Sequence, residues 1–232
     1  MRRGDGPSRL IRFALWLVGA LIVALGLAQI FLPKLAASRI SSRLGKYGQV
    51  QSVHVSAWPA IELLWGDAES VTVRARSLNV SPGQTGKLLW DARGLDKLDL
   101  TAPSTREGPL PLHDVSFDKR GRKMHAQARV SSADVKAALP AGFDVQLLSS
   151  AGGQVQVRAS GGLFGVGASV DAVAQASAGK LVVQPRGLLV EALKLTLFSD
   201  PHVYVEGVSA SAAAADGEAG AGYVLSIDAS LR

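Results

Sequence analysis

The chain has 232 residues, 47% of them hydrophobic, which is enough to bury a substantial core in one or two domains. Its net charge of +6 would suit a protein that binds nucleic acid. However, eight of the 25 basic residues and one of the 19 acidic residues precede residue 48, so residues 48–232 are nearly neutral. The charge therefore flanks one N-terminal segment and forms no groove for nucleic acid, and the absence of cysteine excludes disulfides and thiolate metal sites.

The first 32 residues predict a membrane segment behind a short tail. Residues 1–12 form a basic tail, and residues 13–32 are apolar apart from Gln29. A helix of this length spans a hydrocarbon core of ~30 Å, and it exceeds the apolar region of ~7–15 residues typical of a cleaved signal peptide. We expect an uncleaved single-pass anchor in the plasma membrane, with the tail in the cytoplasm and the domain outside. Cleavage and secretion are the alternative.

Residues 33–46 predict a helix with an apolar stripe and a basic face. The stripe consists of Ala36, Ala37, Ile40, Leu44 and Tyr47. The basic residues that lie largely off it include Arg39, Arg43 and Lys46. One interpretation is that the basic face meets anionic headgroups, at ~1 kcal/mol per basic residue near such a surface. The other is a solvated face on a helix that packs against the domain.

Two strands with an apolar segment between them follow. Residues 49–57 and 71–76 alternate apolar and polar side chains, as half-buried strands do. Between them, residues 58–66 carry one charge, Glu62, and predict a two-turn helix that is apolar nearly all round. Such a helix must be buried in protein or in lipid.

The rest of the chain reads mainly as strands. We expect a turn at 81–83, a brief apolar cluster at 87–90, a strand at 95–100 and a proline-rich loop or edge at 102–111. Residues 115–117 and 124–130 predict a hairpin with a polar turn at 119–122, and Ser131 caps a small helix that Pro140 ends. Seven further strands are expected at 143–149, 154–160, 163–174, 180–185, 193–198, 203–210 and 223–231. The prediction is an α+β, β-dominated domain over residues 34–232, with a long curved antiparallel sheet or a barrel.

No motif in the sequence predicts catalysis. The four histidines lie far apart with no metal spacing, no serine-hydrolase elbow is present, and the glycine-rich run at 160–167 lacks the lysine of a phosphate loop. We therefore assign no catalytic residue, no metal ligand and no cofactor. Carboxylates from distant strands can still meet in space, so an envelope hydrolase or transferase stays open as a third hypothesis.

The remaining candidates for a functional site are apolar side chains that the predicted strands and helices do not assign to a core. They suit ordinary core, and as a group they also suit a groove for acyl chains, in which each buried CH₂ contributes ~0.8 kcal/mol. The predicted groove residues are Trp58, Ile61, Leu64, Trp65, Leu89, Trp90, Leu139 and Phe143.

The order of elements resembles a known family. The resemblance covers residues 34–232 and rests on the helix at 35–44, Ala57-Trp58-Pro59, the apolar segment that ends at Gly66, and the strand at 71–76. It continues through Asp114-Val115-Ser116-Phe117, Ser131-Ser132-Ala133-Asp134-Val135, the stretch 180–185 and the hairpin at 203–207. On these markers the chain is similar to the LmeA-like phospholipid-binding proteins of actinobacterial cell envelopes, long catalogued as a domain of unknown function.

This resemblance implies an exported, non-enzymatic protein that binds phospholipid and supports envelope lipid or lipoglycan maintenance, with a curved sheet around a helix as in tubular lipid-binding domains. An uncleaved anchor would depart from members that have a cleaved signal. The expected partners are phospholipid and the plasma membrane, without nucleic acid. Arg74, Arg76 or the basic helix residues would lie near the phosphate. A scaffold protein that binds envelope proteins through sheet edges is the alternative.

Overall fold

The computed structural model describes residues 28–29, 31–57, 68–107, 110–139, 142–163, 166–186, 194–214 and 221–232. This part of the chain holds two β-sheets and three helices, so the β-dominated prediction is confirmed. The apolar segment at 58–66 lies outside the described residues, as does nearly all of the predicted anchor at 13–32. Among the helices that the structure describes, none combines the length and the apolar character needed to cross a membrane.

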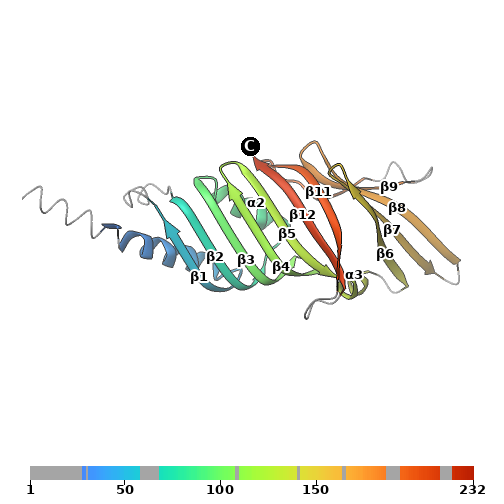
Figure 1. Ribbon diagram of the computed structural model, residues 1–232, viewed down its shortest axis with the longest axis horizontal. Helices are drawn as coiled ribbons and strands as arrows, with labels where there is room; N and C mark the ends of the chain where they lie inside the picture. Colours follow the sequence, from blue (N-terminus) through green and yellow to red (C-terminus); the bar gives the residue numbers. More distant parts are fainter. Residues whose placement is uncertain are drawn as a thin grey trace, which may run out of the picture.

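The larger sheet has seven strands in the order β1-β2-β3-β4-β5-β12-β11 (Figure 1). Their bounds are Gly48–Ser56 (β1), Ala68–Asn79 (β2), Leu95–Glu107 (β3), Leu110–Arg120 (β4), Lys123–Ser131 (β5), Gly222–Leu231 (β12) and Val203–Ala213 (β11). β2 and β3 run parallel, and the other neighbours run antiparallel. The expectation of a purely antiparallel sheet is therefore wrong at β2–β3, because a helix between these two strands carries the chain back to the same end of the sheet.

The smaller sheet has five antiparallel strands in the order β10-β9-β8-β7-β6, so the β-strands form two sheets and not one long one. Their bounds are Phe143–Ala151 (β6), Gln154–Leu163 (β7), Val166–Ser177 (β8), Lys180–Arg186 (β9) and Leu195–Phe198 (β10). This sheet lies at the end of the molecule away from helix 31–44 (Figure 1). In sequence it is inserted between β5 and β11, whereas β5 pairs with β12.

The two sheets meet along the outer edge of β11. The amide of Val205 donates to the carbonyl oxygen of Gly179 at 3.0 Å, and the amide of Val208 donates to that of Gly153 at 3.3 Å. Both glycines lie in hairpin turns of the smaller sheet and have positive φ, a conformation that glycine adopts without a steric penalty. The hairpin ends therefore satisfy donors that an exposed edge strand would leave unpaired.

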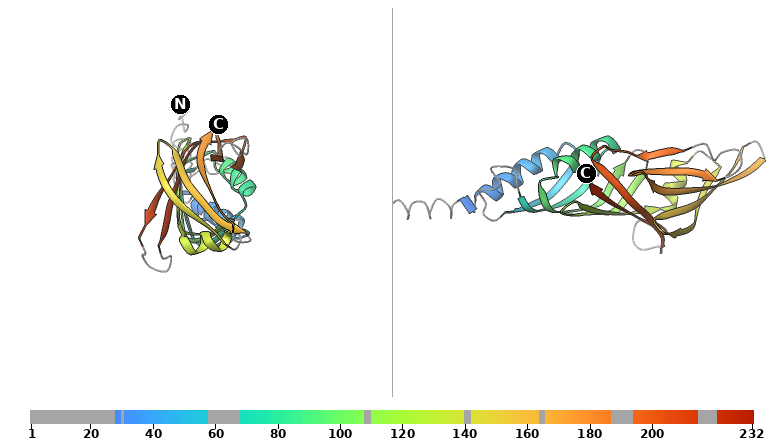
Figure 2. Two further views of the ribbon diagram at one scale, coloured as in Figure 1. Left: turned by 90° about the vertical axis from the view of Figure 1, so that its right-hand side faces the viewer. Right: turned by 90° about the horizontal axis from the view of Figure 1, so that it is seen from above.

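The helix predicted at 33–46 is observed at 31–44 and lies on one face of the larger sheet, which we call the inner face. Ala36, Ala37, Ile40 and Leu44 of the predicted stripe pack against a buried cluster on β1 and β2, whereas Tyr47 lies in the turn after the helix. That cluster consists of Val55, Ala68, Val71 and Val73. Figure 2 shows helix 31–44 and α2 on the same side of the sheet.

The second helix, α2 (Pro82–Asp91), is the crossover between β2 and β3. Ser81 is its N-cap, Gln84 completes a capping box, and Pro82 stands in the first turn, where its missing amide costs nothing. The turn expected at 81–83 was wrong, because these residues begin this helix, and the apolar cluster expected at 87–90 lies in the same helix.

The stretch 102–111 is also more regular than its prolines indicate. β3 runs through Pro103 to Glu107 in the interior of the sheet. The register places Pro103 opposite Asp114, whose φ of 49° accompanies a register shift between β4 and β5. A local irregularity on the partner strand thus accommodates a residue that has no amide to donate.

Candidate functional site

The inner face carries an unbroken apolar row across the larger sheet. Register pairs place one apolar side chain of each strand next to that of its neighbour. From β1 to β11 the row reads Val53, Val73, Leu100, Phe117, Ala126, Ile227 and Val208. Because side chains alternate between the faces of a strand, the polar residues between these positions point the other way.

Burial along this row is uneven. Val73 is 2% exposed beneath helix 31–44, and Val208 is 8% exposed where the smaller sheet packs. Phe117, Ala126 and Ile227, in the middle strands, remain partly exposed. The two ends of the inner face are therefore covered, and the middle keeps accessible apolar surface.

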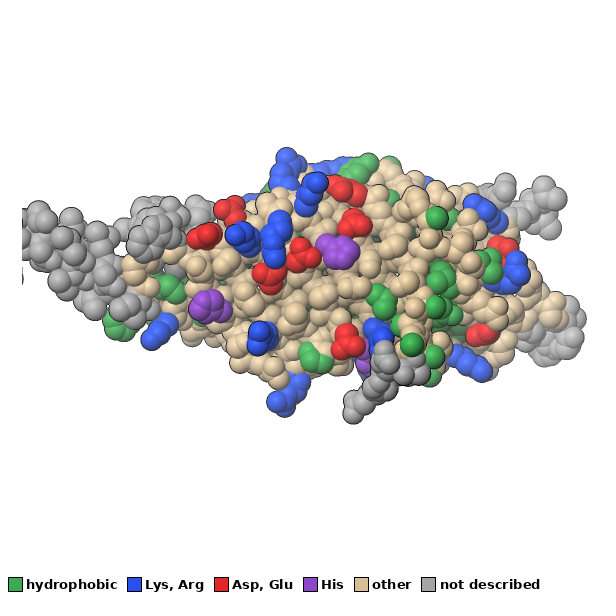
Figure 3. All heavy atoms as spheres, viewed as in Figure 1, with side chains coloured by type: hydrophobic (Ala, Val, Ile, Leu, Met, Phe, Trp, Pro, Cys, Tyr) green, Lys and Arg blue, Asp and Glu red, His purple; other side chains and the backbone are tan. Residues whose placement is uncertain are grey.

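The outer face of the same strands is polar. One residue along each strand from the apolar row lies a second row, whose members pair across neighbouring strands from β3 to β12. This row includes Asp99, Asp118, His125 and Asp228. Arg120 Nη2 donates to Asp99 Oδ1 at 2.7 Å, and His125 Nδ1 lies 2.7 Å from Asp228 Oδ1. Figure 3 shows charged and histidine side chains over this sheet, whereas hydrophobic side chains gather where the smaller sheet begins. Among the described residues, no group of histidines and carboxylates could hold a metal ion.

Lys119 is an exception on the apolar face. It is 0% exposed and lies between Leu98 and Met124 in the register, with Nζ donating to the carbonyl oxygen of Leu95. Burial lowers the pKa of Lys119, and the charge of Asp96 opposes this shift in part. The predicted polar turn at 119–122 was therefore wrong for this residue, and its burial leaves it no surface for a headgroup.

The predicted groove residues that the structure describes fall into two groups. Leu89 of α2 packs against the cluster that contains Met124 and Val203, with Phe117 beside it. The ring centroid of the next residue, Trp90, lies 4.0 Å from that of His202.

The second group lies next to α3 (Ser132–Ala138) (Figure 1). Leu139 caps the C-terminus of α3 and is partly buried. The ring of Phe143, at the start of β6, lies against Gly161, where a Cβ atom would come within 2.5 Å of Cδ1. Trp58, Ile61, Leu64 and Trp65, also predicted for the groove, lie outside the described residues.

The predicted headgroup residues lie on two surfaces. Arg39 and Arg43 are exposed on helix 31–44, and Lys46 is exposed in the turn after it. Arg74 and Arg76 are exposed on β2, alternating with the buried Val73 and Ala75, so they lie on the outer face. Any contact between these two arginines and a ligand is therefore on the side of the sheet opposite to the apolar row.

A serine, an aspartate and a histidine meet at the start of α3. Ser131 Oγ donates to Asp134 Oδ2 at 2.5 Å, and His113 Nε2 lies 3.0 Å from the same oxygen. A nucleophilic serine needs a base on its own hydroxyl, whereas here the histidine bonds to the carboxylate. Ser131 Oγ also accepts the amide of Asp134 at 2.9 Å, so the group is a helix N-cap.

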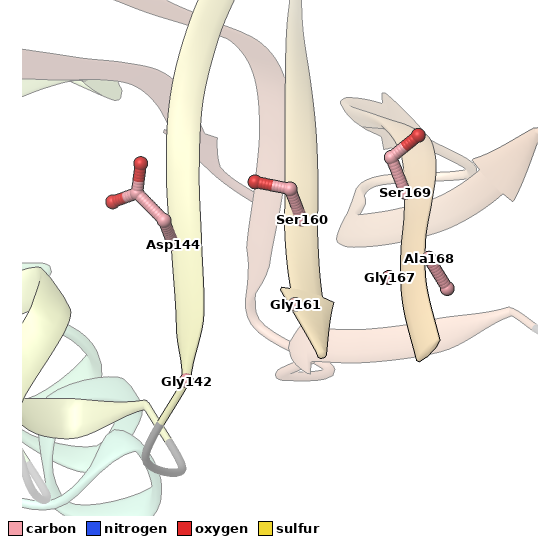
Figure 4. A pocket seen from close by; sticks show the side chains of 7 residues that line it. All are labelled: Gly142, Asp144, Ser160, Gly161, Gly167, Ala168 and Ser169. Carbon is pink, nitrogen blue, oxygen red and sulfur yellow. The ribbon is translucent and has the colours of Figure 1, made fainter. Parts of the chain in front are cut away.

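The smaller sheet has a shallow hollow of about 420 Å³ at its far end. Asp144, Ser160 and Ser169 lie in a row across three neighbouring strands there, and Ala168 points the other way (Figure 4). The described residues that line this hollow include no histidine and no lysine, so the two hydroxyls and the carboxylate form no recognisable arrangement of nucleophile, base and orienting group.

Sequence reasoning missed the middle of the apolar row as a site. Alternation in 115–117 and 124–130 already indicated strands with one apolar face. The juxtaposition of Phe117, Ala126 and Ile227 depends on the register between strands that are distant in sequence, and no local pattern encodes that register.

A family model described as LmeA-like phospholipid-binding matches residues 23–220. The match covers most of the chain and every described strand before β12. No curated protein and no solved structure matches the chain significantly.

Proposed function

Because the chain belongs to the LmeA-like phospholipid-binding family, we propose that it binds phospholipid acyl chains on the inner face of the larger sheet without catalysing a reaction. The observation that carries this proposal is the apolar row, whose middle members Phe117, Ala126 and Ile227 stay partly exposed. Apolar surface of this kind favours a ligand with methylene groups, at ~0.8 kcal/mol for each CH₂ removed from water.

The chemistry of the site supports binding without turnover. The side chains around the middle of the row are hydrocarbon, and Lys119, the one buried cation among the described residues, is held by a backbone carbonyl group. The Ser131, Asp134 and His113 group serves a helix N-terminus. Affinity from buried methylene groups requires none of these polar groups to act on the lipid.

We further propose that the protein works at the extracytoplasmic surface of the plasma membrane, in envelope lipid or lipoglycan maintenance. The apolar stretch at 13–32 would anchor it, and helix 31–44 follows directly. Phe31 and Leu35, 57% and 60% exposed on this helix, and the basic Arg39 and Arg43 would then contact lipid headgroups. Retention in carbonate-washed membranes, with protease access to the domain from outside, tests this arrangement.

The binding proposal is tested by filling the middle of the row. Ala126→Trp places a large ring between Phe117 and Ile227, so we expect phospholipid binding to weaken by at least about tenfold, the loss of roughly two buried methylene groups. Native mass spectrometry of residues 34–232, purified without detergent and titrated with phosphatidylglycerol, gives the bound fraction.

Gln127→Trp is the matched control, because Gln127 is the next residue on the same strand and is exposed on the outer face. It should bind lipid as the wild type does, and far-ultraviolet circular dichroism should report the same fold for both variants. Equal lipid occupancy in both folded variants would refute the inner face as the binding surface.

A further inference from the structure

The smaller sheet has an apolar face of its own. Register pairs place Leu147, Val157 and Ala172 in one row across β6, β7 and β8, and Val145, Ala159 and Val170 in the next. On the opposite face of the same strands, Arg158 donates two hydrogen bonds to Asp171, at 2.7 and 2.9 Å. Around this ion pair the sheet is thus polar on one side and apolar on the other, although Val173 and Val182 are buried on the side of the ion pair.

This apolar face is continuous with the inner face of the larger sheet. Leu147 and Val157 of the smaller sheet pack against the same buried cluster as Leu225 and Ile227 of β12. Tyr223, two residues before Leu225 on β12, reaches the carbonyl oxygen of Val145 with its hydroxyl at 3.5 Å. The hydrocarbon side chains of this shared cluster therefore connect the middle of the apolar row to the smaller sheet.

Beyond this junction the described residues leave the apolar face partly uncovered. Val170 is 39% exposed and Leu195, on the edge strand β10, is 62% exposed, while Ala159 and Ala172 on the same face are partly exposed. The two rows carry hydrocarbon side chains alone, so they offer a phosphate or a sugar no partner. The surface suits the uncharged part of a ligand whose other part is bound elsewhere.

We propose that the apolar face of the smaller sheet is the second section of the acyl-chain surface, occupied by the distal methylene groups of long chains. The first section lies on the larger sheet, and this inference rests on the function proposed for it. Chains too short to cross the junction use the first section alone, so the smaller sheet sets a preference for long acyl chains.

The test compares two neighbouring residues on β8 that face opposite ways. Val170→Asp places a carboxylate on the apolar face, and Ser169→Asp places one on the polar face, where Ser169 is already exposed. Because both side chains are exposed, neither substitution buries a charge. The full chain in a non-ionic detergent is titrated with dioctanoyl, dipalmitoyl and distearoyl phosphatidylglycerol, and binding is followed by native mass spectrometry.

We expect the affinity of the wild type to rise with chain length. Val170→Asp should bind the dioctanoyl lipid normally and the two longer lipids on the order of tenfold more weakly, because about two methylene groups lose their apolar contact. Ser169→Asp should match the wild type throughout.

Unchanged binding of all three lipids by Val170→Asp would overturn the inference and leave the inner-face proposal standing. An equal loss for the dioctanoyl lipid would also overturn it, because the smaller sheet would then belong to the first section. A wild type that binds none of the three lipids would remove the proposed function itself and this inference with it.

Discussion

Asp134 ties the start of α3 to the larger sheet through a single carboxylate. Its Oδ2 atom accepts from Ser131 Oγ and lies within hydrogen-bond distance of His113 on β4. Both interactions lower the pKa of Asp134, with the Ser131 hydrogen bond as the larger cause. α3 has seven residues and buries none of them, so its position depends on this cap more than on packing.

Asp134→Asn is expected to lower the free energy of unfolding by about 1 kcal/mol near neutral pH, because a neutral amide oxygen accepts from Ser131 and His113 less strongly than a carboxylate does. A lowered carboxyl pKa adds stability above the unfolded-state pKa, and this is lost as the pH falls through the folded-state value. The difference between variant and wild type should therefore shrink at about pH 3. Urea unfolding at both pH values checks this, with the exposed Asp144→Asn as control. A difference independent of pH would assign the effect to packing.

At the scale of elements, α2 packs against one part of the inner face, the cluster of Met124, Val203, Ala229 and Leu231, and a few contacts hold it there. Leu89 contacts the cluster of Met124 and Val203, and the Trp90 ring stacks on His202. The Asp200 carboxylate lies so close to Gly86 that a Cβ atom there would come within 2.0 Å of Oδ2. The helix therefore depends on contacts with the corner between β10 and β11.

Trp90→Ala removes the stacking contact and is expected to destabilise the protein by about 2 kcal/mol, combining lost aromatic pairing and lost apolar burial. Hydrogen exchange should rise in peptides from 84–91 more than in peptides from β4 or β5, because α2 would detach while the sheet remains. Lys87→Ala, an exposed site on the same helix, serves as control. Uniform loss of protection across the sheet would show that α2 is part of the cooperative core.

The sequence predicts where strands and helices occur more readily than it predicts which strands pair with one another. Alternation identified the strands near 49–57, 71–76 and 124–130, since a strand with one buried face must alternate. The start of α2 carried a proline and a capping pair, yet Ser81-Pro82-Gly83 also suits a turn, and the local pattern does not decide between them.

Two other features could not be predicted from local patterns. The parallel pairing of β2 and β3 follows from recognising α2, because a short turn would have implied a hairpin. The burial of Lys119 follows from the length of β4, which continues to Arg120 and keeps Lys119 in phase with Phe117. A lysine beside a turn ordinarily faces water, so the sequence predicted that Lys119 would be exposed.

At the scale of the whole molecule, β11 joins the two sheets. Its residues Val205 and Val208 are buried with Val155 and Leu181 of the smaller sheet, and its outer amides bond to the hairpin turns. One cluster thus belongs to both sheets, and unfolding either sheet exposes it. We expect the described part of the chain to unfold as one cooperative unit.

Val208→Ala leaves a small cavity in the shared cluster and should lower the free energy of unfolding by about 1–3 kcal/mol. Ser209→Ala, the next residue on the exposed side of β11, should change it by less than about 0.5 kcal/mol. Guanidinium unfolding followed by circular dichroism and by tryptophan fluorescence should give coincident single transitions for both. Two separated transitions in Val208→Ala would mean that the sheets fold independently.

The position of β12 has a consequence for how the chain reaches this structure. β12 lies between β5 and β11 in the larger sheet, although the whole smaller sheet separates β5 from β12 in sequence. During synthesis the first five strands emerge early and then wait for this partner, with β5 as an open edge and the apolar row interrupted. Closing so long a loop is entropically costly and slow, and an unpaired edge pairs readily with other chains. The interval before β12 inserts is therefore when we expect nascent copies to be most prone to aggregate, because the edge of β5 and the apolar row are both still open.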